Sequence, residues 1–233
     1  MTENLRTIFY DCHLQHGAKI TEFGGWDMPL QYTGILQEHL ATRKGAGLFD
    51  VSHMGRFYIR GEEALPFLQH VLTNNAAALD VGLGQYTMIP NDSGGVIDDA
   101  YLYRFVEDEY LLVVNASNRE KDWAHLDVIR AGFPRTEMVD RTFEVAMLSL
   151  QGPLAKDIMS GIIRGELPEP MRNELSIVEI DGARVQLART GYTGEPICFE
   201  LFIERDDAVR VWNRLTDNGA TPVGLGARDS LRL

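Results

Sequence analysis

The sequence predicts an α+β fold with mostly antiparallel sheets and flanking helices. Three observations lead to this prediction. Strand-like and helix-like patterns alternate along all 233 residues, several strands follow one another through short turns, and no internal repeat or low-complexity linker separates them. With 45% hydrophobic and 24% charged residues, the composition is that of an ordinary globular protein. The length suits one large domain or two modest ones.

Turn residues and hydrophobic spacing delimit the elements of the first half. Gly17 ends the first helix, Gly24 and Gly25 form a turn, and the second helix ends near Gly45. Asn91–Gly95 is a strong turn cluster between two alternating runs. In chain order we expect a helix at 3–16, a strand at 18–23, helices at 35–45 and 62–72 around a strand at 56–60, strands at 86–90, 96–105 and 110–115, and a helix at 118–131 with Trp123, Leu126 and Ile129 on one stripe.

The second half repeats the style of the first without repeating its sequence. Asp181 and Gly182 form a hairpin turn between two alternating runs, and Gly219 ends a helix. We expect a strand at 143–150, a helix at 153–163, strands at 177–180, 184–189 and 198–203, a helix at 206–215, and the start of another helix near 226.

Charge and cysteine content exclude several classes of function. The chain has 34 acidic and 22 basic residues, a net charge of −12, and no basic stripe for nucleic-acid phosphates. Its two cysteines, Cys12 and Cys198, cannot form a disulfide framework. No apolar run is long enough to span a bilayer, and the N-terminal residues do not look like a targeting segment. We therefore expect a cytoplasmic protein, or a mitochondrial matrix protein in a eukaryote, with no nucleic-acid or membrane partner.

Most catalytic and metal-binding motifs are absent. The sequence has no HExxH, CxxC, GxSxG or Walker A motif. Cys12, His13 and His16 are too few for a typical metal site, so we expect no metal. Ser52 and His53 are adjacent, but no elbow glycine precedes the serine, and this disfavours a hydrolase.

Two clusters remain as candidates. Successive strand residues point to opposite faces, so Asp99, Tyr101 and Tyr103 share one face of the strand at 96–105, a suitable wall for a flat aromatic ligand. Alternatively, Asp98 and Asp99 merely follow a glycine turn. Likewise, Arg189–Glu195 is either a binding loop or a polar turn between strands.

Seven motifs in one order resemble the aminomethyltransferase family, the T-protein of the glycine cleavage system. The resemblance covers residues from about 14 to 233. It implies the first two domains of a three-domain cloverleaf, with the third domain absent. A discontinuous first domain would comprise 1–50 and 140–226, and an incomplete second domain 51–139 and 227–233. The motifs are GGWDMPL at 24–30, LFDVSHMG at 48–55, GGVIDD at 94–99, VNA at 114–116, QGP at 151–153, RTGYTGE at 189–195 and GLGARD at 224–229.

The resemblance also implies a reaction and a site. The family transfers the methylene carbon of an aminomethyl group on the lipoyl arm of H-protein to tetrahydrofolate and releases ammonia. It uses tetrahydrofolate as co-substrate and neither metal nor flavin. Asp99 would be the catalytic acid, in agreement with the face it shares with Tyr101. Pro196 lies in a segment one residue longer than in the family, which could shift the register of Glu200. The folate-binding residues would be Tyr86, Tyr101, Tyr103, Val113, Asn115, Tyr192, Glu200 and Arg228.

Two other functions stay open at this point. One is another folate-dependent one-carbon transferase or demethylase of the same superfamily, including the folate domain of an oxidase, which a flavin domain would reveal. The other is a non-catalytic folate-binding factor for iron–sulfur assembly. Such factors carry a Lys-Gly-Cys motif, and neither Cys12 nor Cys198 lies in that context.

Overall fold

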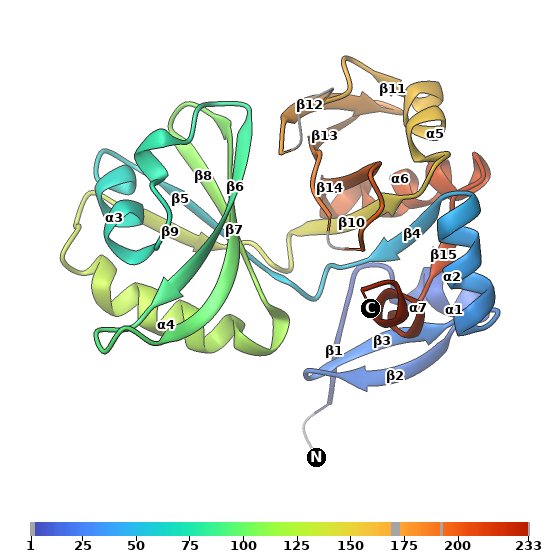
Figure 1. The fold of residues 1–233 in the computed structure, drawn as a ribbon, viewed down its shortest axis with the longest axis horizontal. Helices are drawn as coiled ribbons and strands as arrows, with labels where there is room; N and C mark the ends of the chain where they lie inside the picture. The colour runs from blue at the N-terminus through green and yellow to red at the C-terminus, as the bar shows by residue number, and fades with distance from the viewer. Residues whose placement is uncertain (1–2, 169–172, 192, 233) are drawn as a thin grey trace. The chain divides into compact units, whose positions relative to one another are not determined.

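The computed structural model describes residues 3–168, 173–191 and 193–232 (Figure 1). These residues form two compact units. The first contains the described residues up to His53, those from Phe143 to Pro168, and those from Ser176 onward. The second contains Met54–Thr142 and Asn173–Leu175. Three sheets with mostly antiparallel pairs and flanking helices confirm the predicted α+β class.

The first unit contains a seven-stranded sheet and a three-stranded sheet. The strand orders are β11-β12-β13-β14-β10-β4-β15 and β1-β3-β2. The strands are β1 (Leu5–Arg6), β2 (Lys19–Phe23), β3 (Trp26–Gln31), β4 (Gly47–Asp50), β10 (Val145–Gln151), β11 (Ile163–Arg164), β12 (Leu175–Ile180), β13 (Ala183–Ala188), β14 (Cys198–Glu204) and β15 (Thr221–Val223). The helices are α1 (Tyr10–Gln15), α2 (Ile35–Lys44), α5 (Ala155–Ile162), α6 (Arg205–Asp217) and α7 (Leu225–Leu231).

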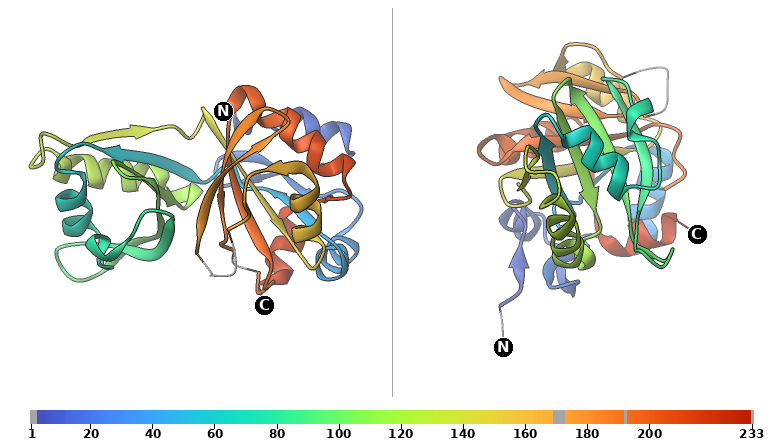
Figure 2. Two further views of the ribbon diagram at one scale, coloured as in Figure 1. Left: turned by 90° about the horizontal axis from the view of Figure 1, so that it is seen from above. Right: turned by 90° about the vertical axis from the view of Figure 1, so that its left-hand side faces the viewer.

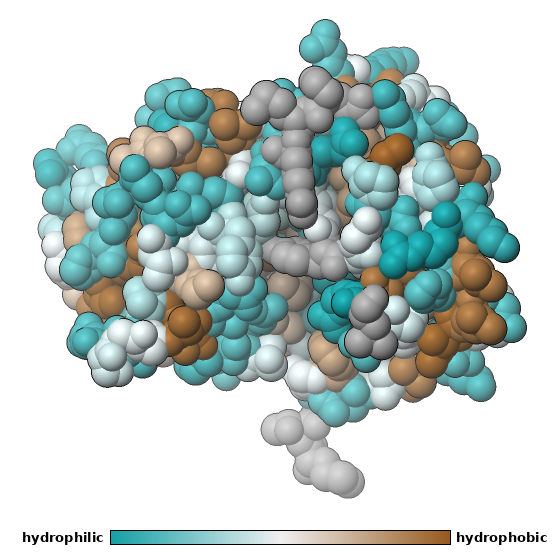
Figure 3. All heavy atoms as spheres, viewed as in Figure 1, coloured by the Kyte–Doolittle hydropathy of each residue, from teal (hydrophilic) through white to brown (hydrophobic). Residues whose placement is uncertain are grey.

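One face of the seven-stranded sheet forms the core of this unit. Alternate residues of β10 and β14, such as Leu148 and Leu201, pack with Met159 of α5 and Trp212 of α6. The residues on the other face of these strands lie outside this core, so they can be polar. On the surface, hydrophobic side chains gather over α2, where Ile35, Leu36 and Leu40 are exposed (Figure 3).

The second unit is a five-stranded antiparallel sheet of order β6-β7-β8-β5-β9. Helices α3 and α4 cover one face of it (Figure 2). Phe57, Leu102 and Leu112 of the sheet pack with Phe67 and Leu126 of these helices. Its elements are β5 (Gly55–Arg60), α3 (Ala64–Val71), the 3₁₀ helix η1 (Ala76–Ala78), β6 (Leu83–Pro90), β7 (Val96–Val106), β8 (Glu109–Val114), the 3₁₀ helix η2 (Ala116–Asn118), α4 (Arg119–Arg130) and β9 (Glu137–Asp140).

One expectation differs from the structure. The first helix was expected at 3–16, but Leu5–Arg6 forms β1 beside β3 and the helix covers only Tyr10–Gln15. Pairing with a neighbouring strand outweighs the weak helical pattern there. Helix α7 packs against α2 and β3, within the first unit. The family domain boundaries, including the assignment of 227–233 to the second domain, stay a prediction.

Candidate functional site

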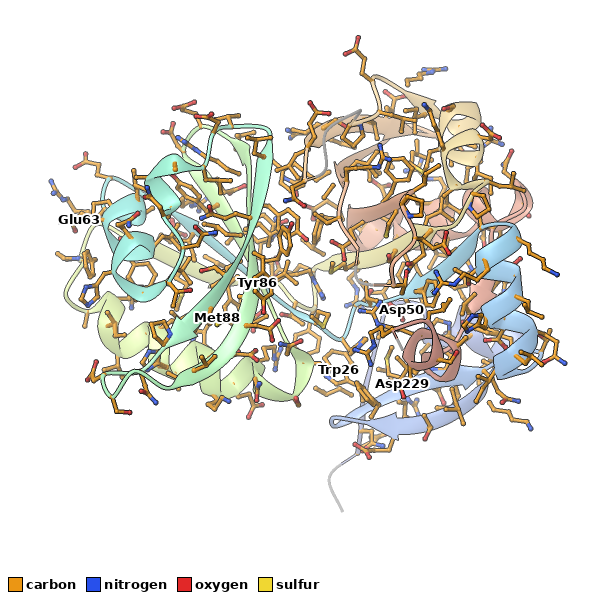
Figure 4. All side chains as sticks on the ribbon, viewed as in Figure 1. Trp26, Asp50, Glu63, Tyr86, Met88 and Asp229 are labelled. Atoms are coloured by element: carbon orange, nitrogen blue, oxygen red, sulfur yellow. The ribbon has the colours of Figure 1, made fainter. Side chains whose placement is uncertain are left out.

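One face of the second sheet carries most of the candidate residues. The register pairs Tyr86 of β6 with Tyr101 of β7, and Tyr101 with Val113 of β8. Asp99 and Tyr103 lie two residues either side of Tyr101, so they point to the same face. The opposite face packs under α3 and α4. The sheet therefore brings Tyr86, Asp99, Tyr101, Tyr103 and Val113 to one face. Strand parity predicted this for Asp99, Tyr101 and Tyr103; Figure 4 shows Tyr86 and Met88 on β6.

Aromatic rings form a continuous row on this face. The centroids of Tyr101 and Tyr103 lie 4.9 Å apart with nearly parallel planes, and the Tyr103 and Phe105 rings are stacked at 6.0 Å. Tyr86 meets Tyr101 edge to face at 6.4 Å. The Tyr101 hydroxyl donates to the side chain of Asn173. Tyr86 is 42% exposed, so its ring is accessible to a ligand. A row of rings of this kind can stack on a planar heterocycle.

Asp99 lies at the end of this row and has two neighbouring donors. Asn115 Nδ2 donates to Asp99 Oδ1 at 2.9 Å. Burial, the Asp99 charge and a hydrogen bond with Asp99 raise the pKa of the Tyr86 hydroxyl. Asn115 directly follows β8, and continuing the register of that strand places it opposite Asp99. The carboxylate is thus held by groups that can orient it for proton transfer.

Asp98 has a different role from Asp99. It is buried on the helix-covered side of β7, where it accepts hydrogen bonds from Asn115 and Asn118. Burial alone would raise the pKa of Asp98, but the hydrogen bonds from Asp122, Asn115 and Asn118 outweigh it and lower the pKa. The two aspartates therefore face opposite sides of one sheet, and they do more than follow a turn.

The first unit holds Glu200 in a polar face of its large sheet. Glu200 lies on β14, opposite Ser149 of β10 and Ala188 of β13, in a ladder without a register shift. Pro196 precedes β14 and does not disturb its pairing with β10 and β13; the position of Glu200 relative to that in the family stays a prediction. The hydroxyl of Thr190 donates to Glu200 Oε2. The Glu200 carboxylate is buried.

Arg228 lies on α7 of the same unit. Burial and the charge of Glu200 raise the pKa of the Cys198 thiol to about 12, while the charges of Arg228 and Arg189 oppose that rise. The charges of Glu200 and Arg228 thus have opposite effects on the pKa of Cys198. Tyr192, also expected in the site, lies outside the described residues.

Other residues singled out from the sequence have structural partners. Ser52 Oγ donates to the Met147 carbonyl oxygen at 3.0 Å, and the His53 ring packs edge-on against Phe23. His13 Nε2 lies 2.9 Å from Asp50 Oδ2, and His16 bonds its own helix backbone. The described part of the chain contains no group of three or more His, Cys, Asp or Glu side chains that could hold a metal ion. None of its helices is long and apolar enough to cross a membrane.

Sequence reasoning missed two sets of buried polar groups. Ser149 and Gln151 occupy alternate positions of a strand that is otherwise apolar, and they join a network with Thr193 and Cys198. Asp122 lies on the same helical stripe as Leu126. A polar residue at a buried position of an otherwise apolar strand or helical stripe is the signal that could have identified both sets.

Comparison with known proteins shows the family of the chain. The family model described as the GCVT N-terminal domain matches residues 9–233. An aminomethyltransferase of Thermus thermophilus is 51% identical over 98% of this chain, which spans 65% of that relative's length. The crystal structure of glycine cleavage system aminomethyltransferase T from Bartonella henselae superposes with a TM-score of 0.88 and 36% identity, covering 98% of this chain and 62% of that one.

A more distant structure shares the fold alone. The heterotetrameric sarcosine oxidase of Corynebacterium sp. U-96 has a TM-score of 0.57 and 16% identity, covering 79% of this chain and 90% of that one. The family match over almost the whole chain decides the classification: the chain belongs to the GCVT N-terminal domain family, the family of the aminomethyltransferases.

Proposed function

We propose that the chain binds tetrahydrofolate and carries the proton-transferring residue of a glycine cleavage aminomethyltransferase. In this reaction the methylene carbon of an aminomethyl group, carried on the lipoyl arm of H-protein, passes to tetrahydrofolate. The observation that carries the proposal is the face of β6, β7 and β8, where Asp99 ends a row of tyrosine rings.

The reaction needs proton transfer but no oxidant. Two carbon–nitrogen bonds form to folate nitrogens, while the carbon–sulfur bond to the lipoyl arm and the carbon–nitrogen bond to the amine break. The two protons lost by the folate nitrogens balance those gained by the departing thiolate and amine. A carboxylate that accepts a proton from one nitrogen and returns it to a leaving group can serve both halves.

Asp99 has the surroundings for this task. Asn115 donates to one of its oxygens, which leaves acceptor capacity for a folate N–H. A negative carboxylate close to the reacting carbon also stabilises an iminium-like intermediate. The tyrosine row would position the pterin ring, and the order of this row fixes how far the ring lies from Asp99.

Glu200 and Arg228 of the first unit are proposed as folate-binding residues as well. Glu200 can accept from the amino group and the adjacent ring nitrogen of a pterin. Arg228 can donate to folate polar atoms or to its anionic glutamate tail. A positively charged side chain such as Arg228 would let a chain with a net charge of −12 bind the anionic folate. The assignment of both residues to folate, and of H-protein as partner, rests on the family resemblance.

The test combines binding with turnover. Calorimetric titration of the chain with (6S)-5-formyltetrahydrofolate, a stable folate, should show saturable binding. With lipoylated H-protein carrying the aminomethyl group, Asp99→Asn should lower ammonia release by roughly a hundredfold, the scale of a lost acid–base group. Asp108→Asn is the matched control, because Asp108 is exposed in the turn after β7.

Two results would contradict the proposal. Absence of folate binding would exclude tetrahydrofolate as the co-substrate. An Asp99→Asn variant as active as Asp108→Asn would exclude Asp99 as the proton-transferring residue. Transfer of the methyl group of an N-methylated amino acid to tetrahydrofolate, without ammonia release from the H-protein substrate, would instead identify a demethylase of the same superfamily.

A further inference from the structure

A second carboxyl group lies behind Asp99, on the helix side of the same sheet. Asp122 belongs to the first turn of α4 and is completely buried. It precedes Leu126 by one helical turn and so points toward the core of the second unit. Neither oxygen of its carboxyl group receives a hydrogen bond from a nitrogen or hydroxyl donor of the described residues. A buried carboxyl without such donors is costly unless it is neutral.

The neighbour of Asp122 is the carboxyl group of Asp98. Asp98 Oδ1 accepts from Asn118 Nδ2 at 2.7 Å and from Asn115 Nδ2 at 3.0 Å. Asp98 Oδ2 accepts from the Asn115 backbone N–H at 3.1 Å. Three N–H donors favour the ionised form of Asp98. An ionised carboxyl can only accept, so a hydrogen bond between these two groups needs a proton on Asp122.

Lys121 fixes the direction of one of these donors. Its Nζ donates to Asn118 Oδ1 at 3.0 Å and to the Ile97 carbonyl oxygen at 2.8 Å. With its oxygen occupied in this way, the Asn118 amide turns its nitrogen toward Asp98. The Asn118 donor is therefore held in place from both β7 and α4.

Asn115 connects this buried pair to the candidate site. Its Nδ2 lies 3.0 Å from Asp98 Oδ1 and 2.9 Å from Asp99 Oδ1, with a longer contact of 3.3 Å to the Asp99 backbone oxygen. An amide nitrogen carries two hydrogens, so one can go to each carboxylate. The orientation of the donor on Asp99 thus depends on Asp98 staying where it is.

We propose that Asp122 and Asp98 are positioning residues for Asp99. A proton held between the two buried carboxyls keeps Asp98 in place, Asp98 orients the Asn115 amide, and that amide holds the Asp99 carboxylate toward the site. The inference rests on the proposed function for its catalytic consequence, but the linkage itself is a property of the chain alone.

The charges around Asp122 and Asp98 set the pH at which the proton shared between them is lost. Burial, the hydrogen bond to Asp98 and the Asp98 charge raise the pKa of Asp122 to about 8; Lys121 lowers it and Asp99 raises it further. These groups, with Asn115 and Asn118, are the charged and polar partners that face the pair from β7, α4 and the segment between β8 and α4. When Asp122 ionises, two adjacent buried carboxylates repel and the linkage breaks.

The first test observes the linkage without folate. In a chain labelled with carbon-13 at aspartate carboxyls, we expect one signal to titrate near pH 8 and to disappear in Asp122→Asn. The Asp99 signal, assigned through Asp99→Asn, should shift over the same pH range in the unmodified chain. In Asp122→Asn the amide can donate to Asp98 at every pH, so the Asp99 signal should stay constant. Asp108→Asn should leave both titrations unchanged.

The second test measures the catalytic consequence. Ammonia release should fall about tenfold as the pH rises through the Asp122 titration, and Asp122→Asn should abolish that fall. Asp122→Ala should lose about tenfold at all pH values, with rescue by asparagine at the same position. If Asp122 only stabilised the fold, replacing it by asparagine would not remove the fall in ammonia release at high pH.

Each outcome decides the proposal. No aspartate titrating above pH 6.5, or an Asp99 signal that ignores the Asp122 titration, would overturn the linkage. An equal fall in ammonia release at high pH in Asp122→Asn and in the unmodified chain would overturn the catalytic consequence. Should the chain bind no folate and release no ammonia, the proposed function fails, while the carboxyl titration still decides the linkage.

Discussion

Replacing Glu38 by glutamine tests how the chain holds α7, the helix that carries Arg228. Glu38 is 1% exposed and lies in the first turn of α2. Its Oε1 accepts from the backbone N–H groups of Tyr32, Thr33 and Gly34 at 2.7, 2.9 and 3.0 Å. Its Oε2 accepts from the Gly224 N–H at 2.8 Å. Gly224 is the N-cap of α7, so one carboxylate serves the N-termini of two helices.

The expected cost follows from these four bonds. Glutamine can keep the three bonds at one oxygen, but without the negative charge that strengthens them. Its amide NH₂ then faces the Gly224 N–H, so one buried donor loses its acceptor and two donors oppose each other. An unsatisfied buried donor costs about 1–3 kcal/mol, and weaker bonds to the other three add to it, so we expect a loss of about 2–4 kcal/mol. For a chain of this length the melting midpoint should fall by roughly 5–10 °C.

The assay is calorimetric melting of the unmodified chain, Glu38→Gln and Glu166→Gln. Glu166 is exposed, so its glutamine variant controls for the loss of one negative charge. Glu38→Gln should also speed amide hydrogen exchange in α7 more than in α6, because α7 loses its capping group. Equal midpoints for the two variants would show that the carboxylate does not stabilise these helix ends.

Three further predictions concern buried charge, backbone geometry and ligand contact. Burial alone would raise the pKa of Asp50, but the bond and charge of His13 outweigh it and lower the pKa; Asp50 therefore stabilises the chain above its ordinary pKa and loses this effect as the pH falls. Asp50→Asn should cost about 3 kcal/mol in urea unfolding at pH 7 and clearly less at pH 3, and an equal cost at both would contradict this. Gly61 has φ of +109° and a Cβ there would meet the Arg135 carbonyl oxygen, whereas Gly94 at +81° has open space; Gly61→Ala should lower the melting midpoint further than Gly94→Ala. Arg228→Ala should weaken folate binding by about 2–3 kcal/mol in calorimetry, with partial recovery by lysine, and unchanged affinity would exclude Arg228 from the site.

Strand parity predicted the central part of the candidate site from the sequence. The period of two is a geometric property of extended backbone, so Asp99 and Tyr101 had to share a face once 96–105 formed a strand. The register with β6 and β8 then added Tyr86 and Val113. This register depends on turn geometry and cross-strand packing, and only the resemblance indicated those two residues beforehand.

Short buried strands could not be predicted in the same way. All four residues of β4 are buried, so no alternation of polar and apolar residues marks this strand. β1 has two residues and exists because it pairs with β3. The packing of α7 against α2 and β3 depends on long-range contacts. The hydrogen bonds around Asp98 also join residues distant in sequence, and no local sequence pattern predicts them.

The central claim is that tetrahydrofolate binds on the face of β6, β7 and β8 that carries Asp99. The most direct measurement is nuclear magnetic resonance of the chain with carbon-13 in its eight tyrosine rings, before and after addition of (6S)-5-formyltetrahydrofolate. Tyr110 is the internal control, because it packs in the core on the opposite face of the same sheet. We expect the signals of Tyr86, Tyr101 and Tyr103 to shift on binding while that of Tyr110 stays in place. Binding without a shift of these three signals, or with an equal shift of Tyr110, would contradict the claim.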